Sequence, residues 1–307
     1  MQIYDSLSEY RGTALSSVTI GKFDGLHQGH RELITRTVNG GRELKARDPR
    51  AVSVVLVMHQ GCRMLLTDSE RRQMLADLGV DILIEQRPTP LFRSTTAEAF
   101  IRDSLCGQLH AAIVSVGQDF RFGYKRSGDR EMLAKAGESY GYRTELVPPV
   151  MKDGQRISST RVREAIAASH MEQAAELLGY PYFFSGSVMH GKELGRKLGF
   201  PTANILPDDS KLLPPFGVYY SLTHLEDVTV AGMTNVGMNP TVQDGDVRIE
   251  THLFDFDGDI YGQDAKVELL HFARPERTFD GVESLKNQLF RDREAGKEFF
   301  TAQSKND

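Results

Sequence analysis

Hydrophobic and polar positions alternate along the first half of the chain in a strand-then-helix pattern. Apolar, β-branched runs predict strands at Ser16–Ile20, Ala51–Met58, Asp81–Ile84, Ala112–Val116 and Thr144–Val147. The amphipathic segments between them predict helices at Glu70–Leu78, Ala97–Leu109 and Arg130–Tyr140. This alternation indicates a parallel sheet with helices on both faces, whose ligands bind at the carboxyl ends of the strands.

Two of these helices are preceded by the pattern of a capping box, in which glutamate follows a hydroxyl residue by three positions. The pairs are Thr67 with Glu70 and Thr95 with Glu98. In a capping box each of the two side chains accepts a backbone N–H of the other residue. We therefore expect one helix to start after Thr67 and another after Thr95.

The pattern changes after about residue 180, where helical periodicity stops and short β-rich runs take over. These runs predict strands at Tyr182–Met189, Gly217–Leu225, Val228–Met233, Val247–Phe256 and Ala265–His271. Asp257-Gly258-Asp259 is typical of a hairpin turn. The short strands predict an antiparallel barrel or sandwich, and amphipathic Gly281–Phe300 predicts a helix packed on it. We therefore expect two domains, residues 1–179 and 180–307.

The composition is that of a globular protein, with 40% hydrophobic and 26% charged residues in 307. A net charge of −5 argues against general nucleic-acid binding. Cys62 and Cys106 lie far apart in sequence, which excludes a disulfide scaffold and a cysteine-rich zinc site. The first residues lack the pattern of a signal peptide, and the apolar runs are too short to span a bilayer. We therefore expect a cytoplasmic protein without nucleic-acid or membrane partners.

The first predicted strand runs into a glycine-rich segment with two histidines, which reads GKFDGLHQGHR from Gly21 to Arg31. Its glycines allow backbone N–H groups to approach a phosphate closely. His27 and His30 are three positions apart at a helix start, so both imidazoles can face one point. That arrangement suits the charge that develops on a phosphate during transfer. Taken alone, the spacing would more often mean a glycine turn with two surface histidines, or a metal pair. Here the strand, the glycine loop and the helix follow one another in register, which favours the phosphate site.

Two later segments carry further candidates for phosphate or nucleotide binding. Ser158 and Ser159 precede a helix predicted at Arg163–Ser169, and their hydroxyls with the guanidiniums of Arg161 and Arg163 suit β- and γ-phosphates. An ordinary capped helix with exposed arginines is the alternative. Asp119 follows a predicted strand in VGQDFRFG, where its carboxylate can contact adenine, ribose or flavin.

The second half has its own polar constellation. Thr202 and Asn204 follow a proline and alternate with apolar neighbours, which places both on one side of an extended strand. A hydroxyl and an amide oxygen, together with ATP phosphates, can complete the oxygen shell of Mg²⁺. Glu250 and His252 share one face of a later predicted strand. A solvated surface pair is the common alternative for the last two.

Taken in order, these motifs resemble those of the bacterial bifunctional riboflavin kinase/FAD synthetases. GKFDGLHQGHR is similar to the nucleotidyltransferase motif G-x-F-D-G-x-H-x-G-H-R, and ISSTRVR to the second phosphate motif of that family. GKELGRKLGFPTAN, starting at Gly191, is similar to the first riboflavin kinase motif. The N-x-G-x-x-P-T segment from Asn235 and the E-x-H segment from Glu250 complete the kinase pattern.

The resemblance implies an α/β doubly wound, Rossmann-like nucleotidyltransferase domain followed by an antiparallel β-barrel kinase domain with a C-terminal helix. It implies that riboflavin is phosphorylated to FMN with Mg-ATP, and FMN adenylylated to FAD with a second ATP. By resemblance, the catalytic residues are His27, His30, Arg161 and Glu250. Nucleotide- or flavin-binding roles fall to Gly21, Phe23, Asp24, Gly29, Asp119, Ser158, Ser159, Arg163, Gly191, Arg196 and Arg274. Thr202 and Asn204 would bind Mg²⁺.

The chain departs from the family at Val57–Cys62, which reads VMHQGC where family members carry T-F-x-P-H-P. Prolines restrict a loop's conformations, so their loss changes the loop's preferred shape. One alternative is therefore a riboflavin kinase with a weak or repurposed nucleotidyltransferase domain. A non-catalytic flavin-nucleotide sensor is another, although a sensor has no need of transfer-specific groups such as His27, His30 and Glu250. A homo-oligomer is compatible with the sequence.

Overall fold

The computed structural model describes residues 1–59, 61, 63–190, 199–238, 247–303 and 305. The chain divides into two compact units, Met1–Ser159 and Thr160–Asp307. Helix α7 (Met171–Leu178) belongs to the second unit because it packs on the strands β11 (Tyr182–Ser187) and β16 (Asp264–Pro275). The boundary that the sequence pattern favours, after residue 179, stays a prediction.

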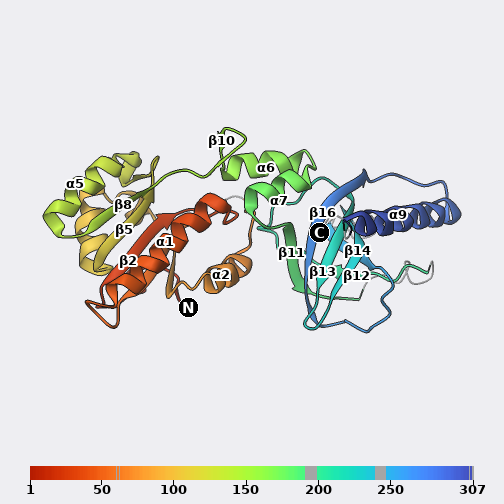
Figure 1. Cartoon of the computed structure of the whole chain (residues 1–307), viewed down its shortest axis with the longest axis horizontal. Coiled ribbons are helices and arrows are strands. Elements are labelled where there is room, and N and C mark those ends of the chain that lie inside the picture. Colours follow the sequence, from red (N-terminus) through yellow and green to blue (C-terminus); the bar gives the residue numbers. More distant parts are fainter. Residues whose placement is uncertain (60, 62, 191–198, 239–246, 304, 306–307) are drawn as a thin grey trace. The chain divides into compact units, whose positions relative to one another are not determined.

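The first unit contains a six-stranded sheet in the order β1-β4-β3-β2-β5-β8, with every pair parallel (Figure 1). The strands are β1 (Gln2–Tyr4), β2 (Ser16–Gly21), β3 (Val52–Met58), β4 (Ile82–Gln86), β5 (Ala111–Gly117) and β8 (Arg143–Val147). The five predicted strands agree with the sheet to within two residues at each end, and β1 adds a short edge. The strand order reverses between β2 and β5, which is where a doubly wound sheet opens a ligand crevice.

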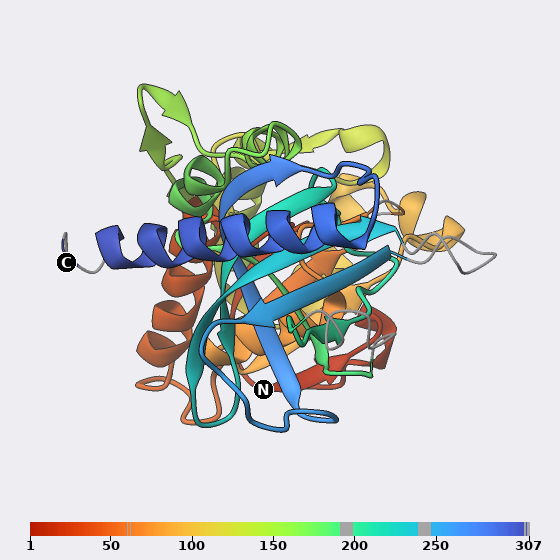
Figure 2. The same cartoon turned by 90° about the vertical axis from the view of Figure 1, so that its right-hand side faces the viewer.

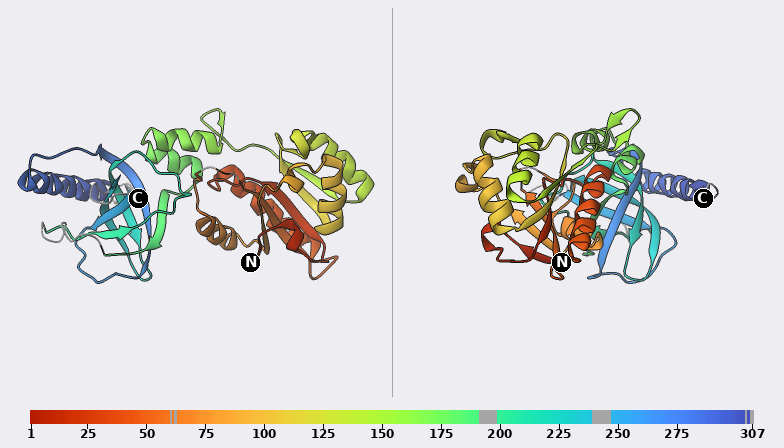
Figure 3. Two further views of the ribbon diagram at one scale, coloured as in Figure 1. Left: turned by 180° about the vertical axis from the view of Figure 1, so that it is seen from behind. Right: turned by 60° about the vertical axis from the view of Figure 1, so that its left-hand side comes forward.

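Helices cover both faces of this sheet, as predicted (Figures 1 and 3). Helix α1 (Gln28–Leu44) approaches the face that carries Ser17, and a Cβ added at Gly40 would lie only 2.5 Å from the Ser17 hydroxyl oxygen. Glycine is therefore needed for this close helix–sheet contact. The opposite face is apolar and forms one core with the π-helix Phe100–Gln108. That core includes Val18, Ile20, Val54, Leu56, Val114, Val116, Phe100 and Leu105.

The predicted capping box at Thr67 is confirmed, whereas the one at Thr95 is wrong. Helix α2 (Asp68–Asp77) begins with reciprocal Thr67–Glu70 hydrogen bonds of 3.2 and 2.9 Å. The later helix is capped one residue further on, by Thr96, which accepts the Ala99 N–H. Measured from Thr96, glutamate stands two positions on instead of three, so the reciprocal bond of a capping box is not available. The predicted helix Ala97–Leu109 is thus a short α4 (Ala97–Ala99) continued by the π-helix.

Helix α5 (Arg130–Tyr140) has the predicted bounds. Helix α6 (Ser159–Ala167) starts four residues before the predicted Arg163. Serine is common at the first positions of a helix, so the hydroxyl-rich run continues into the helix instead of preceding it. The small elements of the first unit are η1 (Leu7–Glu9), α3 (Pro90–Arg93), β6 (Arg121–Phe122), η3 (Tyr124–Arg126), β7 (Gly128–Asp129), β9 (Met151–Lys152) and β10 (Gln155–Arg156).

A network of buried charges fixes the start of α2 beside the carboxyl ends of β3 and β4. The Arg71 side chain is 1% exposed, and its Nη2 lies 2.7 Å from carboxylate oxygens of both Asp68 and Glu85. Arg72 donates a second guanidinium to Glu85 at 2.9 Å. His59, Asp68 and Glu85 have ligand-type atoms within 4.8 Å of one another. Because the Arg71 guanidinium already bridges the two carboxylates, we interpret the cluster as an ion-pair network.

Glu85→Gln should lower the free energy of unfolding of the first unit by about 3 kcal/mol, because it removes the buried charge partner of Arg71 and leaves only the half-exposed Asp68. The double variant Arg71→Met/Glu85→Leu should recover most of that loss, since it removes both charges. Guanidinium denaturation of the whole chain would measure this. The matched control is Asp103→Asn, which breaks the exposed Arg102–Asp103 pair and should cost ~0.5 kcal/mol or less. Equal losses in Glu85→Gln and Asp103→Asn would contradict the assignment.

The second unit is a nearly closed antiparallel barrel, so the barrel alternative of the sequence analysis is confirmed. Its strand order is β11-β16-β13-β14-β15-β12, and all pairs are antiparallel. The remaining strands are β12 (Ala203–Ile205), β13 (Gly217–His224), β14 (Thr229–Met238) and β15 (Val247–Leu253). An isolated bridge brings the two ends together, with the Met189 N–H donating to the Asn204 carbonyl at 2.8 Å.

Helix α9 (Val282–Gln303) packs across the strands of the barrel, as Figure 2 shows. Its residues Leu289, Phe299 and Phe300 join the core around Tyr220 and Phe254. Gly296 is buried, and a Cβ there would lie 2.7 Å from the Phe254 ring. The predicted C-terminal helix is confirmed and continues to Gln303. None of the helices in the described ranges is long and apolar enough to cross a membrane.

The predicted hairpin turn at Asp257–Asp259 is wrong. Strand β15 ends at Leu253 and β16 begins at Asp264, and these strands are not neighbours in the sheet. β15 lies between β14 and β12, whereas β16 lies between β11 and β13. A two-residue turn can join only adjacent strands, so this connection has to be a longer loop.

Candidate active sites

The first candidate site is a cavity of about 150 Å³ at the carboxyl ends of β2 and β5. It lies at the switch point of the sheet, where this architecture places ligands. The residues that line it include Gly21, Phe23, His27, Gly29, His30, Gly117, Asp119, Phe120, Arg156 and Ile157. The structure therefore brings together both predicted histidines, Asp119 and three of the predicted pocket-forming residues.

The two histidines stack at the start of α1, with ring centroids 3.7 Å apart and an interplanar angle of 16°. His27 is the N-cap residue, and its Nδ1 accepts the His30 backbone N–H at 3.3 Å. In the neutral ring the hydrogen is consequently on Nε2, which can donate to a phosphate oxygen. The His30 Nδ1 is buried without a hydrogen-bond partner in the described part of the chain. A Cβ at Gly29 would lie 3.3 Å from the His27 ring, so glycine leaves room for the stack.

Both imidazoles are neutral at pH 7. Burial lowers the pKa of His27 to about 4, and the nearby charge of Arg156 adds to this effect. Burial also holds the pKa of His30 well below its usual value, followed by the influence of His27 and Arg156. The pair can therefore offer uncharged N–H donors to the oxygens of a phosphate.

Arg156→Gln should raise the pKa of His27 above about 4 but leave it below 6.5, because burial is the larger cause. In the native protein the folded state binds this proton less readily than the unfolded chain. Stability should therefore fall as the pH is lowered from about 6.5 to about 4. An NMR titration of the histidine ring protons would measure the pKa, with the His27 signal assigned by its loss in His27→Gln. Titration of that signal near 6.5 would contradict the structure.

Asp24 anchors the loop that carries the histidines. Its carboxylate accepts the Leu65 N–H at 2.7 Å, and its carbonyl accepts the Ser159 hydroxyl at 2.8 Å. The loop backbone is strained, with left-handed φ angles of +48° at Phe23 and +38° at Leu26. Asp24 is buried and is not one of the cavity-lining residues. It shapes the pocket by fixing this backbone, and we infer no direct contact of its carboxylate with a nucleotide.

The segment in which the chain departs from the family lies next to this anchor. Gln60 and Cys62 lie outside the described residues, but Leu65 and Leu66 are buried directly after them. The Leu65–Asp24 bond ties this stretch to the histidine loop, and the Arg71 network fixes the helix that follows. These contacts supply an alternative to the restriction that prolines would provide.

Arg156 is a cavity residue to which the sequence analysis assigned no role. It lies on β10, and its guanidinium makes a two-point ion pair with Asp119, at 2.6 and 3.0 Å. Hydrogen bonds from Arg156 lower the pKa of Asp119. The sequence does contain a clue to this residue. Arg156 begins the motif RISSTRVR, and only Ile157 separates it from the hydroxyl-rich run.

The remaining residues of that motif occupy different places. Ser159 donates its hydroxyl to the Asp24 carbonyl, and Ser158 directly precedes α6. Arg161 and Arg163 lie on α6 in the second compact unit, two positions apart, so their side chains leave the helix on different sides. The phosphate-binding roles of Ser158, Ser159, Arg161 and Arg163 stay predictions.

The second candidate site is a cavity of about 700 Å³ in the barrel unit. Three predicted residues line it, namely Thr202, Glu250 and Arg274. Polar residues to which no role was assigned from the sequence also line it, namely Asn235, His252, Glu276, Arg277, Thr278 and Asp292. Its apolar wall includes Phe200, Val218, Met233, Phe279, Leu285 and Leu289. An apolar wall with a few polar groups suits an aromatic ligand that carries polar substituents.

Thr202 and Asn204 fit a Mg²⁺ ion. Their side chains lie on one side of the strand, since Asn204 Nδ2 is 3.4 Å from the Thr202 hydroxyl oxygen. The Asn204 Oδ1 is buried and has no hydrogen-bond partner in the described part of the chain. Leaving a buried amide oxygen unpaired is costly, and a cation bound with ATP phosphates would satisfy it. Gly191 and Arg196, the other predicted residues of this segment, lie outside the described residues.

Glu250 lies between two amide residues, opposite Asn204 on β12 and Asn235 on β14. Asn235 donates to the Glu276 carboxylate at 3.4 Å, which brings a second acidic group to the cavity. A Cβ at Gly237 would lie 2.0 Å from the Glu276 Oε1. A side chain at position 237 would therefore displace the Glu276 carboxylate from this place.

His252 supports the turn before Thr202. Its Nδ1 lies 3.0 Å from the Pro201 carbonyl oxygen, which can only accept, so Nδ1 carries the hydrogen. Burial lowers the pKa of His252. The sequence places His252 beside Glu250 on one strand face, but it does not show the contact of His252 with Pro201.

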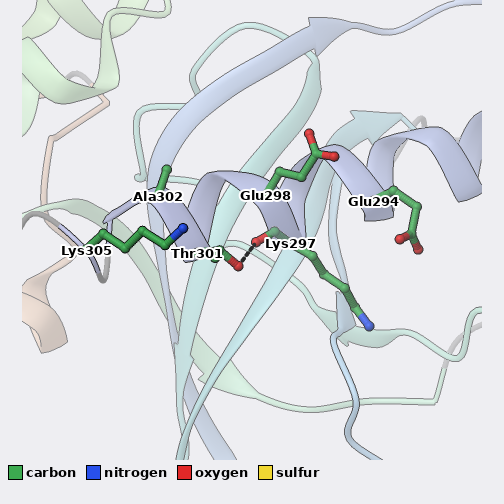
Figure 4. A pocket seen from close by; sticks show the side chains of 6 residues that line it. All are labelled: Glu294, Lys297, Glu298, Thr301, Ala302 and Lys305. Atoms are coloured by element: carbon green, nitrogen blue, oxygen red, sulfur yellow. Dashed lines mark hydrogen bonds between the residues drawn. The ribbon is translucent and has the colours of Figure 1, made fainter.

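A shallow hollow on α9 is not a candidate site. Figure 4 shows its lining, which consists of the α9 residues Glu294, Lys297, Glu298, Thr301 and Ala302 together with Lys305 after the helix. Thr301 donates its hydroxyl to the Lys297 carbonyl at 2.8 Å, and Lys297 pairs with Asp255 at 2.6 Å. We interpret this face as an ordinary solvated helix surface.

The sequence was compared with known families and proteins. It matches the FAD synthetase family over residues 11–161 and the riboflavin kinase family over residues 178–300. The bifunctional riboflavin kinase/FMN adenylyltransferase of Escherichia coli K12 is 38% identical, with 92% of each chain covered. That of Haemophilus influenzae is 36% identical, covering 93% of this chain and 94% of the relative. This chain belongs to the bifunctional riboflavin kinase/FMN adenylyltransferase family.

A solved structure has the same fold as this chain. A protein from Streptococcus pneumoniae named a macrolide-efflux protein covers 96% of the present chain, with a TM-score of 0.82 and 31% identity. Its name describes export, whereas the curated relatives are named as flavin-nucleotide enzymes. We carry only the fold over from this protein, and the fold class expected from the sequence motifs is confirmed.

Proposed function

We propose that the chain phosphorylates riboflavin to FMN in its barrel unit and adenylylates FMN to FAD in its first unit, with one ATP in each step. The observation that carries this proposal is that transfer-specific groups line a cavity in each unit. A stacked neutral histidine pair lines the first cavity, and a carboxylate beside a cation-binding pair lines the second. A protein that only binds flavin nucleotides would have no need of such groups.

In the barrel unit, Glu250 accepts the proton of the ribityl 5′-hydroxyl as its oxygen bonds to the γ-phosphorus of ATP. The bond between that phosphorus and the β–γ bridging oxygen breaks, and ADP leaves. Thr202 and Asn204 would hold Mg²⁺, which neutralises phosphate charge when it is bound. The apolar wall around Phe200 and Leu289 accommodates the flavin ring.

In the first unit, a phosphate oxygen of FMN bonds to the α-phosphorus of ATP, and pyrophosphate leaves. The Nε2–H of His27 and the ring of His30 donate to the oxygens on which charge develops. Arg156 lines the same cavity, where its charge is balanced by the carboxylate of Asp119. We assign the β- and γ-phosphates to Ser158 and Ser159, and a nucleotide or flavin contact to Asp119. The phosphate roles of Arg161 and Arg163, which belong to the second unit, stay predictions from the sequence motif.

Chromatography of the flavin products tests the proposal directly. The whole chain is incubated with Mg-ATP and either riboflavin or FMN. FMN from the first mixture and FAD from the second are expected. FMN without FAD would leave only the riboflavin kinase, with the first domain weakened or repurposed. Flavin binding without either product would favour the sensor.

We also infer from the composition that the enzyme is cytoplasmic and that its partners are the small molecules riboflavin, FMN and ATP. The acidic net charge of −5 argues against a nucleic-acid partner. A membrane partner is not required by any step of the two reactions. A homo-oligomer would be compatible with both.

A further inference from the structure

Arg274 of the riboflavin cavity is held by an acidic residue from the C-terminal helix. Its Nε lies 3.1 Å from both carboxylate oxygens of Asp292, and its Nη2 donates to Asp292 Oδ2 at 2.7 Å. Gln288, one turn earlier on α9, donates to Asp292 Oδ1 at 2.6 Å. The Arg274 and Asp292 side chains are only 17% and 6% exposed. The orientation of the guanidinium is therefore set by α9.

The hydrogen bonds of Arg274 leave one edge of the guanidinium for a ligand. A guanidinium has five N–H hydrogens in a rigid plane. Asp292 takes the Nε hydrogen and one on Nη2, and the Pro275 carbonyl takes one on Nη1 at 3.1 Å. One hydrogen on each terminal nitrogen is left, and we infer that these two form an outer fork directed at the cavity that Arg274 lines. A fork of this kind binds an acceptor oxygen in a defined direction.

Asp292 also changes the charge of the cavity. An isolated arginine would attract phosphates and carboxylates, whereas the Arg274–Asp292 pair has no net charge. Glu250 and Glu276 line the same cavity and add two negative charges, against one positive charge from Arg277. The outer fork therefore favours uncharged acceptors, such as a ring carbonyl or a hydroxyl, over an anion. Riboflavin offers such groups, while FMN adds a phosphate.

We propose that Asp292 is a positioning residue for riboflavin, which acts through Arg274 and makes α9 part of the substrate site. This proposal rests on the proposed kinase function. Asp292 contacts Arg274 and Gln288, and Leu285 and Leu289 on the same helix line the cavity beside it. An acidic residue on the apolar face of an amphipathic helix is costly to bury unless it is paired, and its partner here is a cavity residue.

A double-mutant cycle tests this. Asp292→Asn should raise the KM for riboflavin about tenfold, because the fork loses its fixed orientation. We expect kcat and the KM for ATP to stay within about threefold, since neither depends on this fork. In an Arg274→Met background, Asp292→Asn should have no further effect on the riboflavin KM. Inhibition by the product FMN should strengthen in the single variant, because an unneutralised arginine attracts its phosphate.

Glu298→Gln is the matched control, because it removes one negative charge from the exposed face of the same helix (Figure 4) and should leave every constant unchanged. If Asp292→Asn does not fold, Gln288→Leu removes one hydrogen bond to Asp292 and should raise the same KM to a smaller extent. An unchanged riboflavin KM, or effects of Asp292→Asn and Arg274→Met that simply add, would overturn the proposal. Absence of FMN production by the unsubstituted chain would instead overturn the kinase function itself.

Discussion

His27→Ala should slow FAD formation by about 10²–10³-fold, while FMN formation by the same chain stays within about twofold. The substitution removes an Nε2–H donor from a buried cavity and also the ring on which His30 stacks. Donors that are fixed before the reaction are most effective where charge develops, and water cannot replace them in the same geometry. The kinase groups lie in the other compact unit, so their chemistry should not respond.

The measurement uses FMN with Mg-ATP for the first reaction and riboflavin with Mg-ATP for the second, each followed by initial rates. Supplying FMN directly makes the FAD rate independent of the kinase. The loss should appear in kcat, because the donors act on the transition state more than on bound ATP. A parallel loss of FMN formation would refute the separation of the two sites. A normal FAD rate would refute the role of the histidine pair.

The sheet of the first unit could be predicted because its central strands are buried on both faces. Strands such as β3, which reads VSVVLVM, are apolar almost throughout and stand out from the amphipathic helices between them. The three-residue edge strand β1 has an exposed pattern and gave no such signal. The amino-acid composition of Phe100–Gln108 likewise does not distinguish a π-helix from an α-helix. Its existence depends on how the segment packs against the sheet.

The sites were predictable where the chemistry lies within one short segment. His27 and His30 face one cavity because three positions on a helix place side chains on one side. The roles of Arg156 and Asp292 depend on partners that are 37 and 18 residues away. A charged residue that is buried beside a distant partner looks, in the sequence, like any charged residue on a helix or hairpin. Only the packing of β10 and α9 in the folded protein distinguishes Arg156 and Asp292 from ordinary surface charges.

The structure also bears on the alternative of a weakened first domain. The loss of prolines at Val57–Cys62 raised that alternative. In the structure, Leu65 donates to Asp24, and the Arg71–Glu85 network holds the next helix. The histidine loop is therefore held at Asp24, and the stretch after Cys62 is held by the helix that follows it, by contacts that do not involve proline. We infer that the departure from the family motif is compatible with an assembled adenylyl-transfer cavity.

Glu250→Gln should slow riboflavin phosphorylation by about 10²-fold or more, because the amide keeps the shape of the side chain but cannot accept the hydroxyl proton. The KM for ATP should change little, and FAD formation from supplied FMN should be unaffected. A second carboxylate provides the matched control, since Glu276 lines the same cavity and accepts from Asn235 at 3.4 Å. Glu276→Gln removes the same charge and should cost much less than Glu250→Gln.

The comparison of these two variants locates the proton acceptor. Glu250 faces the cation-binding side of the cavity, because it lies opposite Asn204 in the register of β12 and β15. That places the Glu250 carboxylate near Thr202 and Asn204, which are assigned to the Mg²⁺ ion of Mg-ATP. Glu276 instead follows β16 in a separate loop. A large loss in Glu276→Gln with a near-normal rate in Glu250→Gln would assign proton acceptance to Glu276. Equal, modest losses would show that both carboxylates only adjust the charge of the cavity, and that the hydroxyl loses its proton without a dedicated base.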